Sequence, residues 1–203
     1  MAKSTREYIY GLNPAFEVLR AKRRKVYGAW LNQSSRTKPR MQKLVKLLEQ
    51  NEVPIEWAEK GRLIQLSTSR DHQGVVLKTS LYPYTSFEDL LAHPRLLLLD
   101  NIEDPQNVGA ILRSAEVFGF SGVCLPNRGV PEVYPSIVKV SAGATEFMQI
   151  ARQFSANQYA RKAAEEGYAI AALDMNGNTT LEAMRTAAPE KIMLVIGGAD
   201  KSV

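Results

Sequence analysis

The sequence predicts an α/β protein, with a small N-terminal α/β domain followed by a domain built on a parallel sheet. Short apolar runs alternate along the chain with segments whose apolar residues recur at helical spacing. In the second part several runs are continuously apolar, which is typical of parallel strands covered on both faces. The charge also divides near residue 80: residues 1–80 carry 16 Lys and Arg against 7 Asp and Glu, and residues 81–203 carry 10 against 14.

Composition limits the class of protein. The 203 residues are 45% hydrophobic, which is enough for a substantial core. No run approaches the ~18 apolar residues of a membrane span, and the N-terminus lacks the apolar stretch of a secretory signal. We therefore expect a soluble, cytoplasmic protein with no membrane partner. The single cysteine, Cys124, excludes an internal disulfide and lies in an apolar run, where we expect a buried thiol without a catalytic role.

The first domain is expected to span residues 1–80. A helix is predicted within residues 11–21, with Asn13 as its cap and Pro14 at its first helical position. Strands are expected at residues 26–31, 54–58 and 73–79, a second helix around residues 41–48, and a short helix or turn at residues 61–67. In the second helix apolar residues fall on one face and basic residues largely on the other, so one face can pack and the other can meet an anion.

Residues 81–94 carry two prolines and a brief amphipathic turn, which predicts a linker that still rests against a domain. The second domain is expected to span residues 95–203. Its predicted strands are residues 95–100, 122–125, 168–174 and 191–197, and its predicted helices are residues 107–120, 136–144 and 159–167. This alternation predicts an open parallel sheet with helices on its faces.

A basic run lies in the first domain. Residues 18–48 hold ten Lys and Arg and no acid, a distribution suited to RNA phosphates. A solvated helix face explains such a run equally well. The candidate RNA-binding residues are Arg20, Arg23, Arg24, Lys25, Arg36, Lys38, Arg40 and Lys43.

Several common chemistries are disfavoured. Two histidines, His72 and His93, with no second cysteine argue against a zinc site and against Ser-His or Cys-His catalysis, and we expect no metal. Both histidines are expected to be solvent-facing or capping groups. Neither the dinucleotide-binding G-x-G-x-x-G pattern nor the phosphate-binding G-x-x-x-x-G-K-[ST] pattern occurs, which disfavours dehydrogenases and P-loop NTPases.

Open parallel sheets bind ligands beyond the carboxyl ends of their strands, so the segments after these ends are the candidate site. After the strand that ends at Asp100, Asn107 can cap a helix on which Arg113 points away from the apolar positions. An ordinary structural role for Arg113 is an ion pair with Glu116. The glycines of residues 196–198 could bind a nucleotide-like ligand through backbone groups or form an ordinary tight turn.

Residues 100–125, which include DPQNVGAI and RSAE, closely resemble the first signature motif of the SpoU (TrmH-like) RNA 2′-O-ribose methyltransferases of the SPOUT superfamily. SIVKVSAGATE, at residues 136–146, resembles the family segment that follows, and LVIGG resembles the start of the second motif. YGLNPAFEVLRA and DHQGVVLK are similar to the edges of the L30e-like RNA-binding domain that many members carry. The resemblance therefore covers most of the chain.

The resemblance implies methyl transfer from S-adenosylmethionine to a ribose 2′-hydroxyl of RNA, with ribosomal RNA favoured over tRNA. It also implies a homodimer whose cofactor pocket lies in a trefoil knot. Arg113 and Asn107 match the family's catalytic positions: Arg113 would hold the hydroxyl or its adjacent phosphate electrostatically, and Asn107 would orient Arg113 or the ribose. The residues implied to contact the cofactor are Leu173, Ile196, Gly197 and Gly198.

The sequence departs from the family pattern at two places. Ala199 stands where the second motif normally has a glutamate, and no counterpart of the third motif precedes Val203. We therefore expect that the sequence is cut short and that the chain as given binds the cofactor poorly. Two alternatives follow: a catalytically inactive RNA-binding paralogue or fragment with the same fold, and an unrelated nucleotide-binding α/β enzyme.

Overall fold

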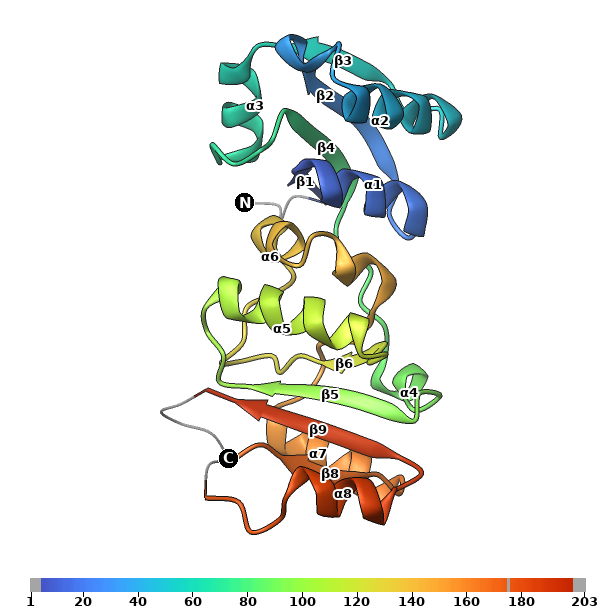
Figure 1. Cartoon of the computed structure of the whole chain (residues 1–203), viewed down its shortest axis with the longest axis vertical. Helices are drawn as coiled ribbons and strands as arrows, with labels where there is room; N and C mark the ends of the chain where they lie inside the picture. The colour runs from blue at the N-terminus through green and yellow to red at the C-terminus, as the bar shows by residue number, and fades with distance from the viewer. Residues whose placement is uncertain (1–4, 175, 199–203) are drawn as a thin grey trace. The chain divides into compact units, whose positions relative to one another are not determined.

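The computed structural model describes residues 5–174 and 176–198 and confirms the predicted α/β class (Figure 1). The chain forms two compact units. The N-terminal unit comprises Met1–Pro83 together with Val133–Phe147, and the C-terminal unit comprises Tyr84–Glu132 together with Met148–Val203. A segment from the second half of the chain therefore packs with the N-terminal unit.

The N-terminal unit is built on a four-stranded sheet in the order β1-β4-β2-β3. Its strands are β1 (Arg6–Tyr10), β2 (Val26–Asn32), β3 (Ile55–Ala58) and β4 (Val75–Ser80). Its helices are α1 (Leu12–Ala21), the 3₁₀ turn η1 (Gln33–Ser35), α2 (Pro39–Gln50), α3 (Lys60–Ser67), α6 (Pro135–Val140) and the 3₁₀ turn η2 (Ala144–Phe147). β2 and β3 are parallel, and β4 is antiparallel to both β1 and β2.

Helix α2 has the predicted amphipathic pattern, because Met41, Leu44 and Leu48 are buried while its basic residues are exposed. The predicted cap of α1 is wrong. The helix begins at Leu12 after Gly11, whose φ of 104° favours glycine. The Asn13 side chain instead accepts a hydrogen bond from Arg40.

His72 is buried rather than solvent-facing, with 3% of its surface exposed. Its Nδ1 accepts a hydrogen bond from the Gly74 amide at 2.9 Å, so its role as a local capping group is confirmed. Burial, together with the nearby charge of Lys60, lowers the pKa of His72, because both disfavour the imidazolium ion. The ring is therefore neutral at pH 7.

The C-terminal unit contains the predicted parallel sheet, with five strands in the order β7-β6-β5-β9-β8. The strands are β5 (Arg95–Asp100), β6 (Gly122–Cys124), β7 (Gln149–Ala151), β8 (Ala169–Ala172) and β9 (Ile192–Gly197). The helices are α4 (Phe87–Leu90), α5 (Pro105–Val117), α7 (Ala156–Glu165) and α8 (Leu181–Ala187).

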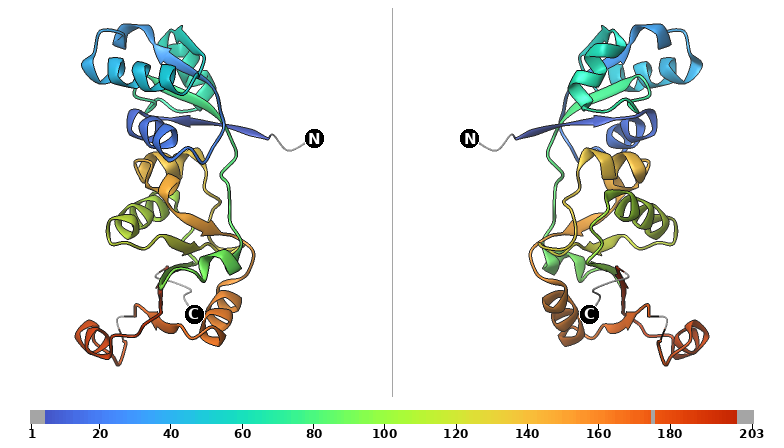
Figure 2. Two further views of the ribbon diagram at one scale, coloured as in Figure 1. Left: turned by 90° about the vertical axis from the view of Figure 1, so that its right-hand side faces the viewer. Right: turned by 90° about the vertical axis from the view of Figure 1, so that its left-hand side faces the viewer.

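Strand β5 is buried on both faces, as its continuous apolar run predicts. Leu96 and Leu98 join the core that contains Tyr159 of α7. Leu97 points to the other face, because neighbouring side chains alternate, and it lines a groove beside α5. Helices α5 and α7 thus cover opposite faces of the sheet (Figures 1 and 2).

The predicted linker is packed along its length. Tyr82 is buried in the N-terminal unit, whereas Phe87 and Leu90 of α4 are buried in the C-terminal unit. A capping box between Ser86 and Asp89 begins α4. The linker therefore carries core residues of both units.

Cys124 is fully buried in β6, as predicted. Burial raises the pKa of its thiol, because a thiolate would be poorly solvated there. No helix in the described part of the chain is long and apolar enough to cross a membrane. Among the same residues, no cluster of three His, Cys, Asp or Glu side chains could hold a metal ion.

Candidate functional site

The three segments selected from the sequence follow neighbouring strands. β9 lies between β5 and β8, and Asp100 at the end of β5 pairs with Gly197 at the end of β9. All neighbouring strands in this sheet are parallel, so their carboxyl ends share one edge. The chain runs outward from β5 through β6 to β7 on one side and places β8 and β9 on the other. This reversal is the topological switch point at which open α/β sheets bind ligands.

Loops at this edge meet around Asn101, which directly follows β5. Asn101 has a φ of 49°, a left-handed conformation that asparagine tolerates better than most residues. The Gly198 amide donates a hydrogen bond to the carbonyl oxygen of Asp100 at 2.9 Å. A Cβ atom at Gly198 would overlap the Asn101 carbonyl oxygen, and one at Gly129 would overlap the Asn101 side chain. Two glycines thus allow two other segments to approach Asn101.

Replacing Gly129 by alanine is expected to destabilise the C-terminal unit more than replacing Gly167 does. Both glycines have positive φ, 75° and 83°, so each substitution costs about 1–2 kcal/mol in backbone strain. Only Gly129 would also displace Asn101, because the space around Gly167 is open to 4 Å. Labelling of the buried, single Cys124 thiol across a urea titration measures unfolding of this unit. Equal shifts in the two variants would contradict the close approach to Asn101.

Helix α5 carries both predicted catalytic residues, but its cap differs from the prediction. The helix begins at Pro105, and Asp104 is the cap, accepting a hydrogen bond from the Gln106 amide at 2.8 Å. Asn107 therefore lies inside the first turn with an exposed side chain. The prediction that it caps the helix is wrong, which leaves the side chain available for another role.

Arg113 is exposed and makes no ion pair or hydrogen bond with any residue in the described part of the chain. The structural alternative, an ion pair with Glu116, is therefore not present. Arg113 lies six positions after Asn107, which on an α-helix is about 9 Å along the axis and on a different face. No hydrogen bond joins the two side chains, so they are available to bind a ligand separately.

The residues predicted for the cofactor lie on β9 and just after β8. Leu173 is 52% exposed, and its amide donates to the Val195 carbonyl oxygen at 3.0 Å. Gly197 ends β9 and Gly198 follows it. Ile196 instead lines an apolar groove of about 340 Å³, between the sheet and α5. Ala199 and Val203 lie outside the described residues.

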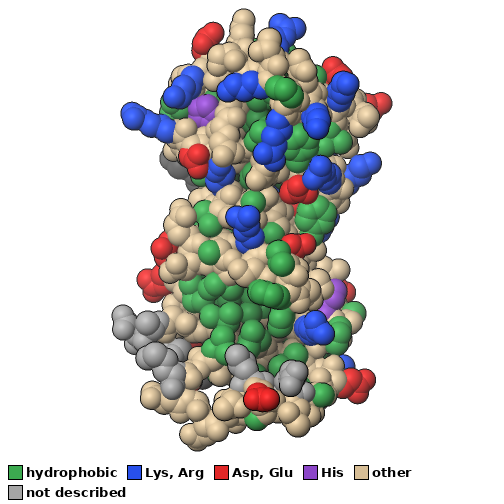
Figure 3. All heavy atoms as spheres, in the orientation of Figure 1, with side chains coloured by type: hydrophobic (Ala, Val, Ile, Leu, Met, Phe, Trp, Pro, Cys, Tyr) green, Lys and Arg blue, Asp and Glu red, His purple; other side chains and the backbone are tan. Residues whose placement is uncertain are grey.

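An apolar surface surrounds this groove on the C-terminal unit (Figure 3). Ile111 and Phe118 of the α5 segment line it together with Leu194 of β9. Val117 and Phe118 are 72% and 71% exposed. The face of α5 that holds the groove is thus largely apolar, whereas Asn107 and Arg113 are among the polar exposed residues of the helix.

Six of the eight predicted RNA-binding residues are exposed on the N-terminal unit: Arg20, Lys25, Arg36, Lys38, Arg40 and Lys43. Lys and Arg side chains are numerous on the face of this unit that Figure 3 shows. Four of the six lie over an aromatic ring. Arg20 and Arg40 share Phe16, with their guanidinium groups 5.3 and 5.9 Å from the ring centre, whereas Lys25 lies over Tyr27 and Arg36 over Trp57. These six remain candidates for RNA contacts.

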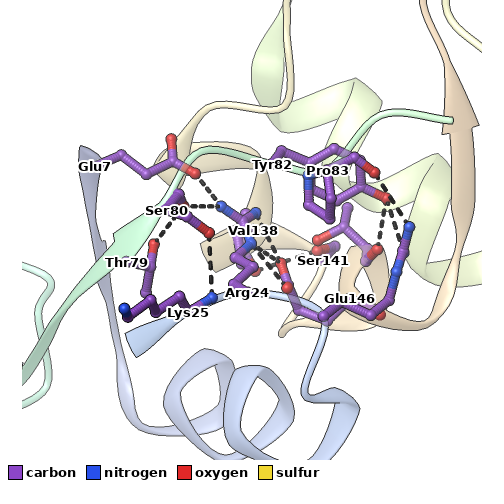
Figure 4. A network of polar contacts seen from close by, with 12 residues as sticks. Glu7, Arg24, Lys25, Thr79, Ser80, Tyr82, Pro83, Val138, Ser141 and Glu146 are labelled. Atoms are coloured by element: carbon purple, nitrogen blue, oxygen red, sulfur yellow. Dashed lines mark hydrogen bonds and ion pairs between the residues drawn. The ribbon is translucent and has the colours of Figure 1, made fainter. Parts of the chain in front are cut away.

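Arg24 is not a surface cation but the centre of a buried network (Figure 4). Its guanidinium donates to both carboxylate oxygens of Glu146, each at 2.9 Å, and also to Glu7. Burial alone would lower the pKa of Arg24, but the two carboxylates outweigh burial and raise it. The Arg24 side chain is buried and already bonded to two carboxylates, so we exclude Arg24 from the candidate RNA-binding residues.

Arg23 extends the same network. It donates to the hydroxyl of Tyr82 and to the carbonyl oxygens of Pro83 and Glu146, at 3.2–3.4 Å. The Tyr82 hydroxyl in turn donates to the Thr145 carbonyl oxygen at 3.0 Å. Arg23 and Arg24 therefore hold residues 133–147 on the N-terminal unit instead of facing solvent as the charge run predicts.

Two residues that organise the site carry little signal in the sequence. Asn101 holds the turn described above, and its only sequence signal is an asparagine directly after a strand. Arg152, which follows β7, donates to the carbonyl oxygens of Val130 at 3.0 Å and Asn127 at 3.4 Å. It thereby fixes the loop that contains Gly129, a role that a single arginine in a sequence does not reveal.

Both parts of the chain match families of known proteins. Residues 94–201 match the SpoU rRNA Methylase family, and residues 8–85 match the family described as RNA 2′-O ribose methyltransferase substrate binding. A Bacillus subtilis protein named as a TrmH family tRNA/rRNA methyltransferase is 28% identical over 97% of this chain and 80% of its own length. An uncharacterized tRNA/rRNA methyltransferase of Mycobacterium sp. strain KMS is 31% identical over 97% of this chain. The chain spans 64% of the length of that mycobacterial relative.

Solved structures show the same fold. A structure described as an RNA 2′-O ribose methyltransferase aligns with a TM-score of 0.76 and 18% identity, covering 98% of this chain and 74% of its own. AviRb of Streptomyces viridochromogenes, a SpoU methyltransferase solved in complex with the cofactor AdoMet, aligns with a TM-score of 0.72 and 15% identity. That alignment covers 97% of this chain and 75% of the other.

Proposed function

Because the chain belongs to the SpoU rRNA methylase family, we propose that it transfers the methyl group of S-adenosylmethionine to a ribose 2′-hydroxyl in RNA. Ribosomal RNA is the first candidate substrate and tRNA the second. The observation that carries the proposal is the position of α5, which presents uncommitted Asn107 and Arg113 side chains from the helix that follows β5. The functional division that we propose is residues 1–80 for RNA binding, residues 81–94 as a linker and residues 95–203 for methyl transfer.

Residues at the shared strand edge fit the cofactor. S-adenosylmethionine supplies a sulfonium-bound methyl group, and it presents an adenine ring with apolar faces and polar edges. Leu173 offers a half-exposed apolar side chain, and Gly197 and Gly198 add no side chain at this edge, although the Gly198 amide is already bonded to the Asp100 carbonyl oxygen. Ile196 contributes to an apolar wall nearby.

Arg113 is proposed to hold the attacking ribose by its hydroxyl or adjacent phosphate. Arginine stays protonated at neutral pH, so it acts through charge and hydrogen bonds rather than as a base. A guanidinium fork can hold two oxygens at once and so align the hydroxyl for in-line displacement. Asn107 is proposed to orient the ribose or its phosphate, because no hydrogen bond joins it to Arg113.

A homodimer, implied by the family resemblance, is a further part of the proposal. The apolar surface around α5 supports it, since Val117 and Phe118 would lose their exposure in such an interface.

Product analysis tests the proposed activity. The protein is incubated with S-adenosylmethionine labelled in its methyl group and with ribosomal RNA or tRNA, and the RNA is digested to nucleosides. We expect label in one 2′-O-methylnucleoside from ribosomal RNA. Label in a base-methylated nucleoside would contradict methylation at the ribose 2′-hydroxyl. Label in tRNA but not in ribosomal RNA would contradict ribosomal RNA as the substrate. RNA binding without cofactor binding or any transfer would favour a non-catalytic RNA-binding protein.

A further inference from the structure

The N-terminal unit contains an open cavity of about 590 Å³, a size within the about 300–1,000 Å³ range of ligand sites. The start of α1, the segment between β2 and α2, the start of α3 and the loop before β4 surround it. Its lining residues are Leu12, Asn13, Asn32, Ser34, Ser35, Lys38, Arg40, Lys60, Arg70, His72, Gln73 and Gly74. Four of these side chains are cationic and none is a carboxylate.

Hydrogen bonds inside the wall orient three amide side chains. The oxygen of Gln73 accepts from the Leu12 amide at 3.1 Å, and the oxygen of Asn32 accepts from the Ser34 amide at 3.0 Å. The oxygen of Asn13 accepts from Arg40. Each partner can only donate, so the accepting atom must be the amide oxygen and the NH₂ group is left over as a donor. These three NH₂ groups have no hydrogen-bond partner among the described residues.

His72 lines the wall as a neutral ring. Its Nδ1 accepts from the Gly74 amide, so the neutral ring carries its proton on Nε2. The ring is 3% exposed, and Nε2 has no partner within the described residues. The cations are also available, since Lys38, Lys60 and Arg70 form no ion pair with a described residue. The cavity therefore presents hydrogen-bond donors and positive charge, and it has few acceptors for a ligand that donates hydrogen bonds.

A second depression continues the positive surface. It shares Arg40 with the cavity and is lined also by Lys43 and by Arg20, which pairs with Glu17 in the same lining. A small anion would need only one of the two depressions. A chain of phosphates can follow both, which favours a polyanion over a single ion.

We propose that this cavity binds a phosphodiester group of the RNA substrate, held by Lys38, Lys60 and Arg70 and by the amide NH₂ groups of Asn13, Asn32 and Gln73. The inference rests on the proposed function and gives the RNA-binding unit a defined anchor. The basic run of residues 18–48 does not include Lys60, Arg70, His72 and Gln73. These residues join the cavity because the fold brings the loop before β4 close to the start of α2. The contact is to the backbone, so it positions RNA without reading its sequence.

Binding of a fluorescent single-stranded oligoribonucleotide, measured by anisotropy at several salt concentrations without methyl donor, tests the proposal. Lys60→Gln and Arg70→Gln are each expected to weaken binding by about fivefold and to reduce the magnitude of the salt slope by about 1. Arg62→Gln is the matched control: Arg62 is exposed on the same helix as Lys60, lies outside the cavity lining and donates only to Gln65, at 3.1 Å. It should change affinity less than twofold.

A titration with inorganic phosphate distinguishes binding of free phosphate from binding of an RNA phosphodiester group. We expect phosphate at millimolar concentration to displace RNA weakly. We also expect RNA to shift the imidazole resonances of His72 in the wild type but not in a variant that carries both Lys60→Gln and Arg70→Gln. Phosphate that occupies the cavity without competition from RNA would overturn the RNA assignment. If the Lys60 and Arg70 variants bind RNA like the wild type, the cavity is not an RNA-binding site, and the proposed methyl transfer is unaffected. A wild-type protein that binds no RNA would overturn the proposed function as well.

Discussion

Replacement of Arg113 by lysine is expected to lower the turnover number for RNA methylation by about 100- to 1,000-fold, with RNA affinity changed less than about twofold. Lysine keeps the charge but loses the planar fork that could hold two ribose or phosphate oxygens together. Loss of a preorganised donor that acts mainly in the transition state has about this effect on turnover. Arg113 makes no contact with described residues that its removal would break, so stability should not change.

Single-turnover methylation and RNA binding, measured on the same preparation, separate the two effects. Arg161→Lys is the matched control, because Arg161 is also an exposed helical arginine, with only a weak contact to Glu165 at 3.9 Å. It should retain wild-type turnover. An Arg113→Lys protein with wild-type turnover would refute the positioning role, and one that lost RNA affinity in proportion would assign Arg113 to binding alone.

Replacement of Arg24 by methionine is expected to lower the free energy of unfolding of the N-terminal unit by about 3–5 kcal/mol. The change leaves the Glu146 carboxylate buried without its partner, and the side chains of this ion pair are 0% and 1% exposed. Arg20→Met is the matched control, because Arg20 pairs with Glu17 at 2.8 Å but is 58% exposed. An exposed pair of this kind contributes up to about 1 kcal/mol.

Tryptophan fluorescence during urea unfolding measures this effect selectively, because both tryptophans, Trp30 and Trp57, lie in the N-terminal unit. The double variant Arg24→Met with Glu146→Leu should regain much of the loss, since it removes both buried charges. Equal effects of Arg24→Met and Arg20→Met would show that the pair contributes no more than a surface contact. A double variant as unstable as Arg24→Met would assign the loss to packing.

The fold was predictable where a local pattern decides the structure. The run at residues 95–100 predicts a strand buried on both faces, and β5 has this pattern. The missed elements are short ones: β7 has three residues, and α8 has seven residues that mix apolar and polar side chains. Capping was the least reliable prediction. Asn13 and Asn107 are both good caps in isolation, but Gly11 and Asp104 precede them and start the helices earlier.

The candidate site was predictable in part. Strand periodicity and the switch-point rule placed the segments after β5, β8 and β9 at one edge, and resemblance supplied the roles of Asn107 and Arg113. Charge counting failed at Arg24, because a run of basic residues does not show which one will meet a distant carboxylate. Glu146 lies 122 positions from Arg24. Such non-local pairs, like the approach of Gly129 to Asn101, follow from tertiary packing alone.

Mapping of ribose methylation in cells that lack the gene tests the central claim most directly. We expect one 2′-O-methylated position of ribosomal RNA to lose its modification, and the wild-type gene but not the Arg113→Lys variant to restore it. Unchanged ribose methylation at every position of ribosomal RNA and tRNA would contradict the assignment of this protein as an RNA 2′-O-methyltransferase.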